Sequence, residues 1–268
     1  MRIRATVAAV SGALALSALA VPAAQAAGNP VSGVTFSNVV INGGKNVVVG
    51  ASAQVTVSAT YTVTHASSVS KSSFSTIPVL YRGTSVDTSS SIIVGDEDGV
   101  CTDSSSTVLK CTAKIQFRPA SSDVDTDLTS AMAGSWKVGA VAVDINNDNN
   151  VKFQNDLGTK NVQRYSKLTV NASPEPVKKG GTVTVTGTLT RASWDAAKYY
   201  GYGTQSVKLQ FRKAGSSTYT TLKTIKTDGS GNLKTTTTAT VDGYFRYSFA
   251  GTSTTAAVSA TGDYVDVQ

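Results

Sequence analysis

Oxygen-bearing side chains recur in one segment, and they are the best candidates in the sequence for binding a metal ion. Asp144, Asn146, Asp148 and Asn150 alternate along Asp144-Ile145-Asn146-Asn147-Asp148-Asn149-Asn150. A tight loop turns alternate residues inward, and Ca²⁺ takes about six to eight oxygen ligands. The spacing therefore permits a calcium site, to which Asp156 can add a carboxylate. No other cofactor is expected.

A hairpin turn is the alternative interpretation of the same segment. Asn and Asp tolerate left-handed backbone and are common in hairpin turns. The segments Val141–Val143 and Val151–Phe153 fit two paired strands. The segment also departs from an EF-hand loop, because Asn149 and Asn155 stand where that loop needs Gly and Glu. Both interpretations stay open on the sequence alone.

Side chains for catalysis are few. His65 is the only histidine, and nucleophilic catalysis most often depends on a histidine base. His65 takes the next inward-facing position after the alternating residues Val55 to Val63, which favours a structural role. Two acidic clusters remain, at residues 96–98 and 123–127. A hydrolase needs two facing carboxyls, and the candidates are Asp96, Asp98, Asp125 and Asp127.

These acidic clusters are explained more simply as solvent-exposed turns than as the two sides of a catalytic cleft. Sugar-stacking aromatic residues are scarce, because the chain has two tryptophans. Trp136 alternates with the apolar residues Val138, Ala140 and Ala142 and is therefore expected to face a core. We therefore assign no catalytic residue and expect the protein not to be an enzyme.

The two cysteines, Cys101 and Cys111, predict a disulfide. In the oxidising environment that a chain meets after export, two cysteines normally form a disulfide. The residues between them at 103–107 are polar, which is typical of a hairpin tip. We expect the bond to join two adjacent strands.

Apolar and polar residues alternate strictly in four segments, which predicts antiparallel strands with one buried face. Many such strands at short spacing indicate a β-sandwich. Helix is expected only in two short loop segments, residues 124–132 and 193–200. The inward sets are Val55, Val57, Ala59, Tyr61 and Val63; Cys111, Ala113, Ile115 and Phe117; Val183, Val185 and Leu189; and Val207, Leu209 and Phe211.

The first 26 residues have the features of a signal peptide. Arg2 and Arg4 precede an uncharged, mostly apolar run over residues 7–21, and Ala24-Gln25-Ala26 fits a signal-peptidase site. The run is shorter than the roughly twenty residues that span a bilayer. We expect cleavage after Ala26, a secreted, extracellular chain and no transmembrane segment.

Charge divides the mature chain into two parts. Residues 27–163 carry 9 basic and 11 acidic side chains (9 − 11 = −2), whereas residues 164–268 carry 13 and 6 (13 − 6 = +7). This change in net charge supports a domain boundary near residue 164. We expect an all-β chain: a signal peptide (1–26) followed by two tandem immunoglobulin-like antiparallel β-sandwich domains (27–164 and 165–268), the second of which folds alone.

Four segments of the second half carry a resemblance to known proteins. They are Ser173-Pro174-Glu175-Pro176-Val177-Lys178-Lys179-Gly180, Trp194 with Tyr199-Tyr200-Gly201-Tyr202, Val207-Lys208-Leu209-Gln210-Phe211-Arg212, and Asp242-Gly243-Tyr244-Phe245-Arg246-Tyr247-Ser248-Phe249-Ala250-Gly251-Thr252. With them the second half resembles an immunoglobulin-like module of secreted actinobacterial (Streptomyces-type) proteins. The first half resembles, more loosely, an uncharacterised domain of the same kind of proteins. The resemblance implies the fold and carries no catalytic residue and no ligand.

Aromatic residues are densest around Trp194, Tyr199, Tyr200 and Tyr202. Such a group can form an exposed contact surface, or it can cover one open end of a sandwich, which is the interpretation we favour. Tyr244, which follows Asp242-Gly243, is expected to form a tyrosine corner.

These features favour a secreted, non-catalytic binding or structural module that acts as a monomer at or near the cell surface. Fold alone does not supply a function, so the partner is left as an extracellular protein or a cell-wall polymer. The dispersed basic charge of the second half predicts no specific nucleic-acid binding. The alternatives are an extracellular hydrolase that uses the acidic loop residues and a secreted enzyme inhibitor.

Overall fold

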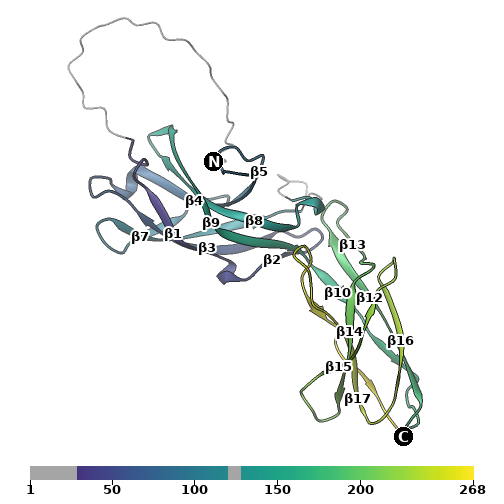
Figure 1. The fold of residues 1–268 in the computed structure, drawn as a ribbon. Coiled ribbons are helices and arrows are strands. Elements are labelled where there is room, and N and C mark those ends of the chain that lie inside the picture. Colours follow the sequence, from purple (N-terminus) through teal and green to yellow (C-terminus); the bar gives the residue numbers. More distant parts are fainter. Residues whose placement is uncertain (1–28, 120–127) are drawn as a thin grey trace, which may run out of the picture.

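The computed structural model describes residues 29–119 and 128–268, which form mostly β-structure (Figure 1). The expected signal peptide (1–26) and the acidic cluster at 123–127 lie outside the described residues. Within the described ranges, no helix is long and apolar enough to cross a membrane.

The described residues form strands and single-turn 3₁₀ helices in the following order: β1 (Thr35–Ile41), η1 (Asn42–Gly44), β2 (Val47–Val49), β3 (Val55–Thr64), η2 (Lys71–Ser73), β4 (Phe74–Arg82), β5 (Ser91–Val94), β6 (Val100–Asp103), β7 (Val108–Phe117), η3 (Ser130–Met132), β8 (Gly134–Asp144), β9 (Asn147–Arg164), β10 (Ser166–Leu168), β11 (Asn171–Ser173), β12 (Thr182–Ser193), β13 (Lys198–Gly201), β14 (Ser206–Lys213), β15 (Thr220–Lys226), β16 (Asn232–Thr238), β17 (Gly243–Phe249), β18 (Val258–Ser259) and β19 (Asp263–Val265).

The first sandwich packs a sheet in the order β1-β3-β7-β6 against a sheet in the order β2-β9-β8-β4-β5. Its strand pairs are antiparallel except for β2 and β9, where Val47 lies beside Val162 in parallel register. The alternating residues of β3 and β7 point inward as the sequence predicts, and Trp136 is 1% exposed in the core. The buried inward residues are Val57, Ala59, Tyr61, Val63, Cys111, Ala113, Ile115 and Phe117.

The second sandwich is organised around β12, which pairs with β10, β11, β13 and β16. The facing sheet has the order β15-β14-β17-β18, with β19 also paired to β17. A buried tyrosine joins the two sheets, because the hydroxyl of Tyr247 donates to the carbonyl of Val185 at 2.9 Å. Burial also raises the pKa of Tyr247. The tyrosine corner expected around Tyr244 stays a prediction: the ring of Tyr244 packs against Tyr264, and the hydroxyl of Tyr247 bonds across the sheets rather than to nearby backbone.

The predicted fold class, all-β with two immunoglobulin-like sandwiches in tandem, is confirmed. The helix expected at residues 193–200 is wrong, because β12 runs to Ser193 and turns directly into β13. The local preference of this stretch is overridden by the burial of Trp194. Of the helix expected at 124–132, residues 128–132 are described: Leu128 forms a β-bridge with Pro119, and Ser130–Met132 form a single 3₁₀ turn.

Only Tyr165 separates the last strand of the first sandwich from the first strand of the second. Its amide donates to the carbonyl of Val49 at 2.8 Å, and its carbonyl accepts from the amide of Ala192 at 2.8 Å. The preceding residue, Arg164, is bonded through its backbone to Thr254 and Ala256, both at 3.0 Å. The chain therefore passes between the sandwiches as a hydrogen-bonded strand.

Trp194 fills the junction of the two sandwiches. Its side chain is 0% exposed and belongs to the same buried cluster as Val49 and Trp136 of the first sandwich. The indole Nε1 donates to the carbonyl of Val49 at 3.2 Å, and the backbone amide of Trp194 donates to Ser130 Oγ at 2.9 Å. A residue of the second sandwich thus completes the core of the first.

The other aromatic residues of this group cover the same end of the second sandwich. Tyr199 packs against the junction cluster and meets Tyr165 edge-on, with ring centroids 6.3 Å apart. Tyr202 meets Phe249 edge-on at 5.8 Å. Tyr200 remains 53% exposed. The group is therefore mainly an internal cover rather than an open contact surface.

We predict that Trp194→Ala destabilises the protein by about 3–5 kcal/mol, because it leaves a cavity where the two sandwiches meet. Tyr200→Ala is the matched control from the same hairpin and should stay within about 0.5 kcal/mol of wild type. Urea unfolding measures both, and equal losses in the two variants would contradict the account. Independent folding of residues 166–268 stays a prediction, and such a fragment would expose Trp194.

Candidate functional site

Cys101 and Cys111 form a disulfide between adjacent strands, as predicted. Cys101 on β6 lies directly opposite Cys111 on β7. β6 is the edge strand of its sheet, so the bond fastens a four-residue edge strand to the ten-residue strand beside it. The polar stretch that follows β6 forms the tip of the hairpin.

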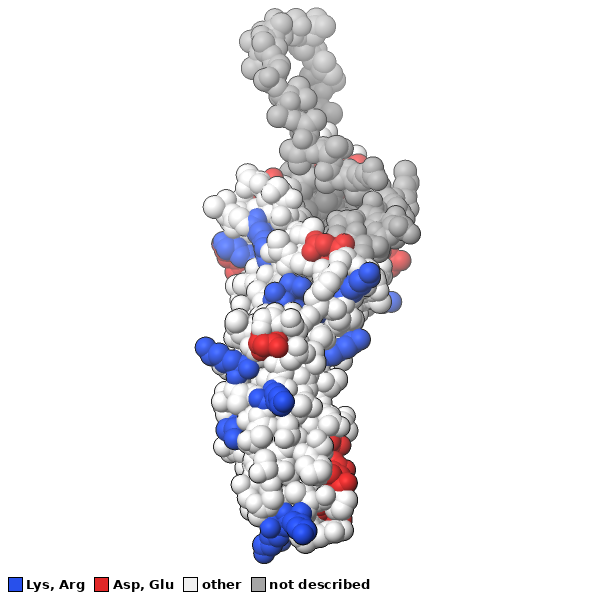
Figure 2. All heavy atoms as spheres, turned by 90° about the vertical axis from the view of Figure 1, so that its right-hand side faces the viewer, with Lys and Arg blue, Asp and Glu red and all other residues white. Residues whose placement is uncertain are grey.

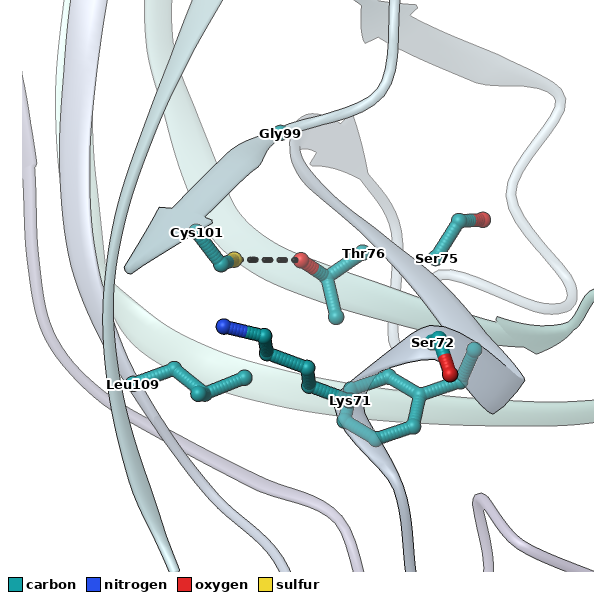
Figure 3. Close-up of a pocket in the computed structure, with 8 residues that line it drawn as sticks. Lys71, Ser72, Ser75, Thr76, Gly99, Cys101 and Leu109 are labelled. Carbon is teal, nitrogen blue, oxygen red and sulfur yellow. Dashed lines mark hydrogen bonds between the residues drawn. The ribbon is translucent and has the colours of Figure 1, made fainter. Parts of the chain in front are cut away.

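A recess lies beside this disulfide, at the edge between the two sheets of the first sandwich (Figure 3). It has a volume of about 260 Å³. The lining comes from η2 and β4 on one side and from β6 and β7 on the other, with hydroxyl groups, one ammonium group and apolar side chains. The lining residues are Lys71, Ser72, Phe74, Ser75, Thr76, Gly99, Cys101 and Leu109.

Two polar side chains of the recess, Lys71 and Thr76, have partners within the first sandwich. Lys71 Nζ forms an ion pair with Asp103, and Thr76 Oγ1 lies 3.7 Å from Cys101 Sγ (Figure 3). Thr76 Oγ1 also lies 2.9 Å from the hydroxyl of Tyr61. The ammonium of Lys71 is therefore engaged by a carboxylate at the mouth of the recess.

Nothing in the sequence pattern pointed to this recess. Its two sides are about thirty residues apart in the chain, at 71–76 and 99–109, and they meet only because one sheet packs on the other. Most of its polar residues are Ser and Thr, which are common throughout the sequence. The cysteine pair was the one detectable signal near it.

The residues considered for catalysis have structural contacts. His65 is 7% exposed, its Nδ1 lies 3.0 Å from the carbonyl of Ala66, and its ring packs edge-on against Phe74. Asp96 forms an ion pair with Arg118. Among the described residues, no group of three or more His, Cys, Asp or Glu side chains is placed to hold a metal ion. Asp125 and Asp127 lie outside those residues.

The Asp/Asn segment forms a tight hairpin between β8 and β9. Asp144 ends β8 opposite Asn147, so Ile145 and Asn146 make the turn. The carboxylate of Asp144 is nearly buried and accepts from the amide of Asn146 and from Asn150 Nδ2, both at 3.0 Å. These bonds, that of Asn150 first, lower the pKa of Asp144.

The four candidate calcium ligands are only partly brought together. Asp144 and Asn150 are in contact, Asn146 reaches Asp144 through its backbone, and Asp148 is exposed on β9. Asp156 lies six residues beyond Asn150, about 20 Å along an extended strand, and its carboxylate contacts Lys137 at 3.0 Å. Asp156 is therefore not part of this loop, whereas calcium binding by the other four residues stays a prediction.

Basic charge is dispersed on the face shown in Figure 2. Lys and Arg side chains there stand apart, with uncharged surface between them. This view is taken from the side on which β13 and β16 lie in Figure 1. On that face the excess of basic residues does not form one patch.

Comparisons with known proteins add similarities of fold only. No family model matches the sequence, and no curated protein matches it. Among solved structures, the D00-D0 domain of intimin aligns over 86% of this chain and 99% of its own, with 15% identity and a TM-score of 0.27. The Yersinia pseudotuberculosis adhesin InvE aligns over 87% and 58%, with 13% identity and a TM-score of 0.26. The mouse nectin-like molecule 4 ectodomain aligns over 86% and 65%, with 15% identity and a TM-score of 0.25. The function has to be argued from the chain's own residues.

We predict that replacing both cysteines by alanine lowers stability by about 2.5–3 kcal/mol, from the entropy of the small loop that the bond closes. The loss should be local to the first sandwich. Hydrogen exchange should therefore rise around β6 and β7 and stay unchanged in β14 and β17. Two thiols that alkylate freely in the native, unreduced protein would contradict this account.

The calcium prediction has a direct thermal test. Extracellular calcium modules bind at about 10⁻⁴–10⁻³ M, and calcium at ten times the dissociation constant would add about 1.4 kcal/mol to the folded state. We expect Ca²⁺ to raise the melting temperature of the first sandwich. Mg²⁺ at equal ionic strength should have no such effect, and neither should Ca²⁺ on Asp144→Ala. If about 10 mM Ca²⁺, well above that affinity range, leaves melting unchanged, the segment is a hairpin turn only.

Proposed function

We propose that this protein is a secreted, monomeric, non-catalytic module that binds or spaces other molecules at or near the cell surface. The junction is the observation that carries this proposal. A one-residue connection, backbone hydrogen bonds on both sides of it and the buried Trp194 fix one sandwich against the other. A rigid tandem of this kind keeps its binding faces at a constant separation.

The disulfide supports an extracellular location. Disulfides persist in oxidising compartments and are rare where thiols are kept reduced. Cys101 and Cys111 fasten the edge strand β6 to β7 and so keep this short strand paired. Secretion accounts for both the bond and the expected signal peptide.

The contacts of the first sandwich support a non-catalytic role. The ammonium of Lys71, the imidazole of His65 and the carboxylate of Asp96 each have a partner within the fold. Their partners are a carboxylate, a backbone carbonyl and a guanidinium rather than the hydroxyl or thiol that a catalytic base activates. These three side chains are used to hold loops and strand ends in place.

The function is tested by locating the protein and by assaying it. We expect the full chain, expressed in a secreting bacterium, to be found in the medium or wall fraction and to crosslink to a surface component there. We expect no turnover on panels of glycosidase, protease and esterase substrates. Turnover that disappears in Asp96→Asn or Asp125→Asn would overturn the proposal in favour of a hydrolase.

A further inference from the structure

On the outward face of the sheet formed by β15, β14 and β17, residues that pair across neighbouring strands form rows. Each of four successive rows contains one basic side chain. The rows are set by the outward residues of β14, namely Ser206, Lys208, Gln210 and Arg212. Lys226 lies beside Ser206, Lys208 occupies its own row, Arg246 lies beside Gln210, and Arg212 occupies the fourth row. We call Lys226, Lys208, Arg246 and Arg212 the basic row.

The four side chains of the basic row are evenly spaced along the sheet. Outward residues on a strand are two positions apart, so the rows follow one another at about 6.6 Å. Strands β14, β15 and β17 contain no Asp or Glu. The acidic residue of the neighbouring strand β19, Asp263, lies beside the inward residue Phe245 and accepts from the amide of Ala172 at 2.7 Å. Lys208 and Lys226 are exposed, and Arg212 and Arg246 are partly exposed. The face therefore presents a line of positive charge along the strand direction.

The two arginines are held in place by aromatic rings and hydrogen bonds. The guanidinium carbon of Arg246 lies 3.7 Å from the ring centre of Tyr219, and that of Arg212 lies 4.1 Å from the ring centre of Tyr244. Arg246 Nε donates to Gln210 Oε1 at 2.9 Å, and Arg212 Nη1 donates to the carbonyl of Ser216 at 2.5 Å.

These contacts leave binding capacity on both guanidinium groups. A guanidinium has about five N–H donors in a fixed fork, and each of these hydrogen bonds uses one. A group that is already oriented loses little conformational freedom when it binds an anion. Arg212 and Arg246 are therefore pre-organised for an anionic group.

The ring contacts favour a polyanion without bases. Single-stranded nucleic acids bind by stacking bases on open aromatic faces. The ring of Tyr219 is covered by Arg246 and flanked by Arg212, whose guanidinium carbon is 5.3 Å from its centre. The tyrosines thus hold arginines instead of stacking on a ligand. A phosphodiester shares one negative charge between two oxygens, which can both accept from a guanidinium fork, and this pairing is strong and directional.

We propose that the basic row binds a linear phosphodiester polymer without bases, of the polyol-phosphate type, along the face formed by β15, β14 and β17. The polymer would lie parallel to the strands, with successive phosphates meeting successive rows. This proposal rests on the extracellular binding role proposed above and gives that role a class of partner.

The test measures binding of the full mature chain to synthetic poly(glycerol phosphate) at low ionic strength. We expect salt-sensitive binding, because each phosphate contact releases counterions. Arg212→Gln with Arg246→Gln should weaken it about tenfold or more. Lys198→Gln with Lys234→Gln is the matched control, since it removes the same charge from strands β13 and β16 of the opposite sheet, and it should change binding little.

A second variant guards against misfolding of the arginine variant. Lys208→Gln with Lys226→Gln changes two exposed side chains, and it should weaken binding and reduce its salt dependence while circular dichroism stays unchanged. Equal losses in the basic-row and control variants, or no retention of the polymer by wild type, would overturn the proposal.

The class of polymer is tested with two further probes of matched charge. Polygalacturonate carries carboxylates, and a single-stranded oligonucleotide carries phosphates with bases. We expect both to bind more weakly than poly(glycerol phosphate), and equal or tighter binding of either one overturns the proposed class. A surface or wall location found by fractionation would still stand in that case, so the two failures can be told apart.

Discussion

The burial of Trp194 against Val49 is the interaction on which the arrangement of the whole chain depends. An indole has a large apolar surface and one N–H donor that needs a partner when buried. The carbonyl of Val49 supplies that partner and also accepts the amide of Tyr165, so both of its lone pairs are used. One backbone group on a three-residue strand therefore anchors both the side chain and the connecting residue. The two sandwiches are fixed together without a long linker.

This junction separates the two kinds of surface that the molecule offers. The first sandwich has the disulfide-fastened edge and its recess, in which Lys71 and Thr76 are bonded to neighbouring side chains. The second sandwich has the basic row, whose arginines are oriented but keep donors to spare. A rigid connection would hold the second surface at a set distance from the first. That division explains how a chain without a catalytic constellation in its described residues could serve as a spacer and a binding module.

The sequence allowed the strand pattern and the disulfide to be predicted, because both depend on local periodicity and residue type. Alternation in β3 and β7 places every second side chain inward. Two cysteines in an oxidising compartment are expected to form a disulfide with each other. The contacts between sheets could not be predicted in this way. Tyr247 rather than Tyr244 joins the sheets of the second sandwich, since parity alone does not say which hydroxyl reaches a carbonyl. The sequence predicts Trp194 among covering aromatic residues but predicts a helix where the structure has a hairpin, because the residue against which Trp194 is buried lies 145 positions away.

The central claim is that the two sandwiches tumble as one body, and residual dipolar couplings of backbone amides test it most directly. Couplings would be measured for the weakly aligned mature chain and fitted separately for residues 35–164 and 166–265. The account predicts one alignment tensor, with the same magnitude and orientation for both sets. Two tensors of clearly different magnitude would show that the sandwiches move independently, and the junction would then not be the constraint described here.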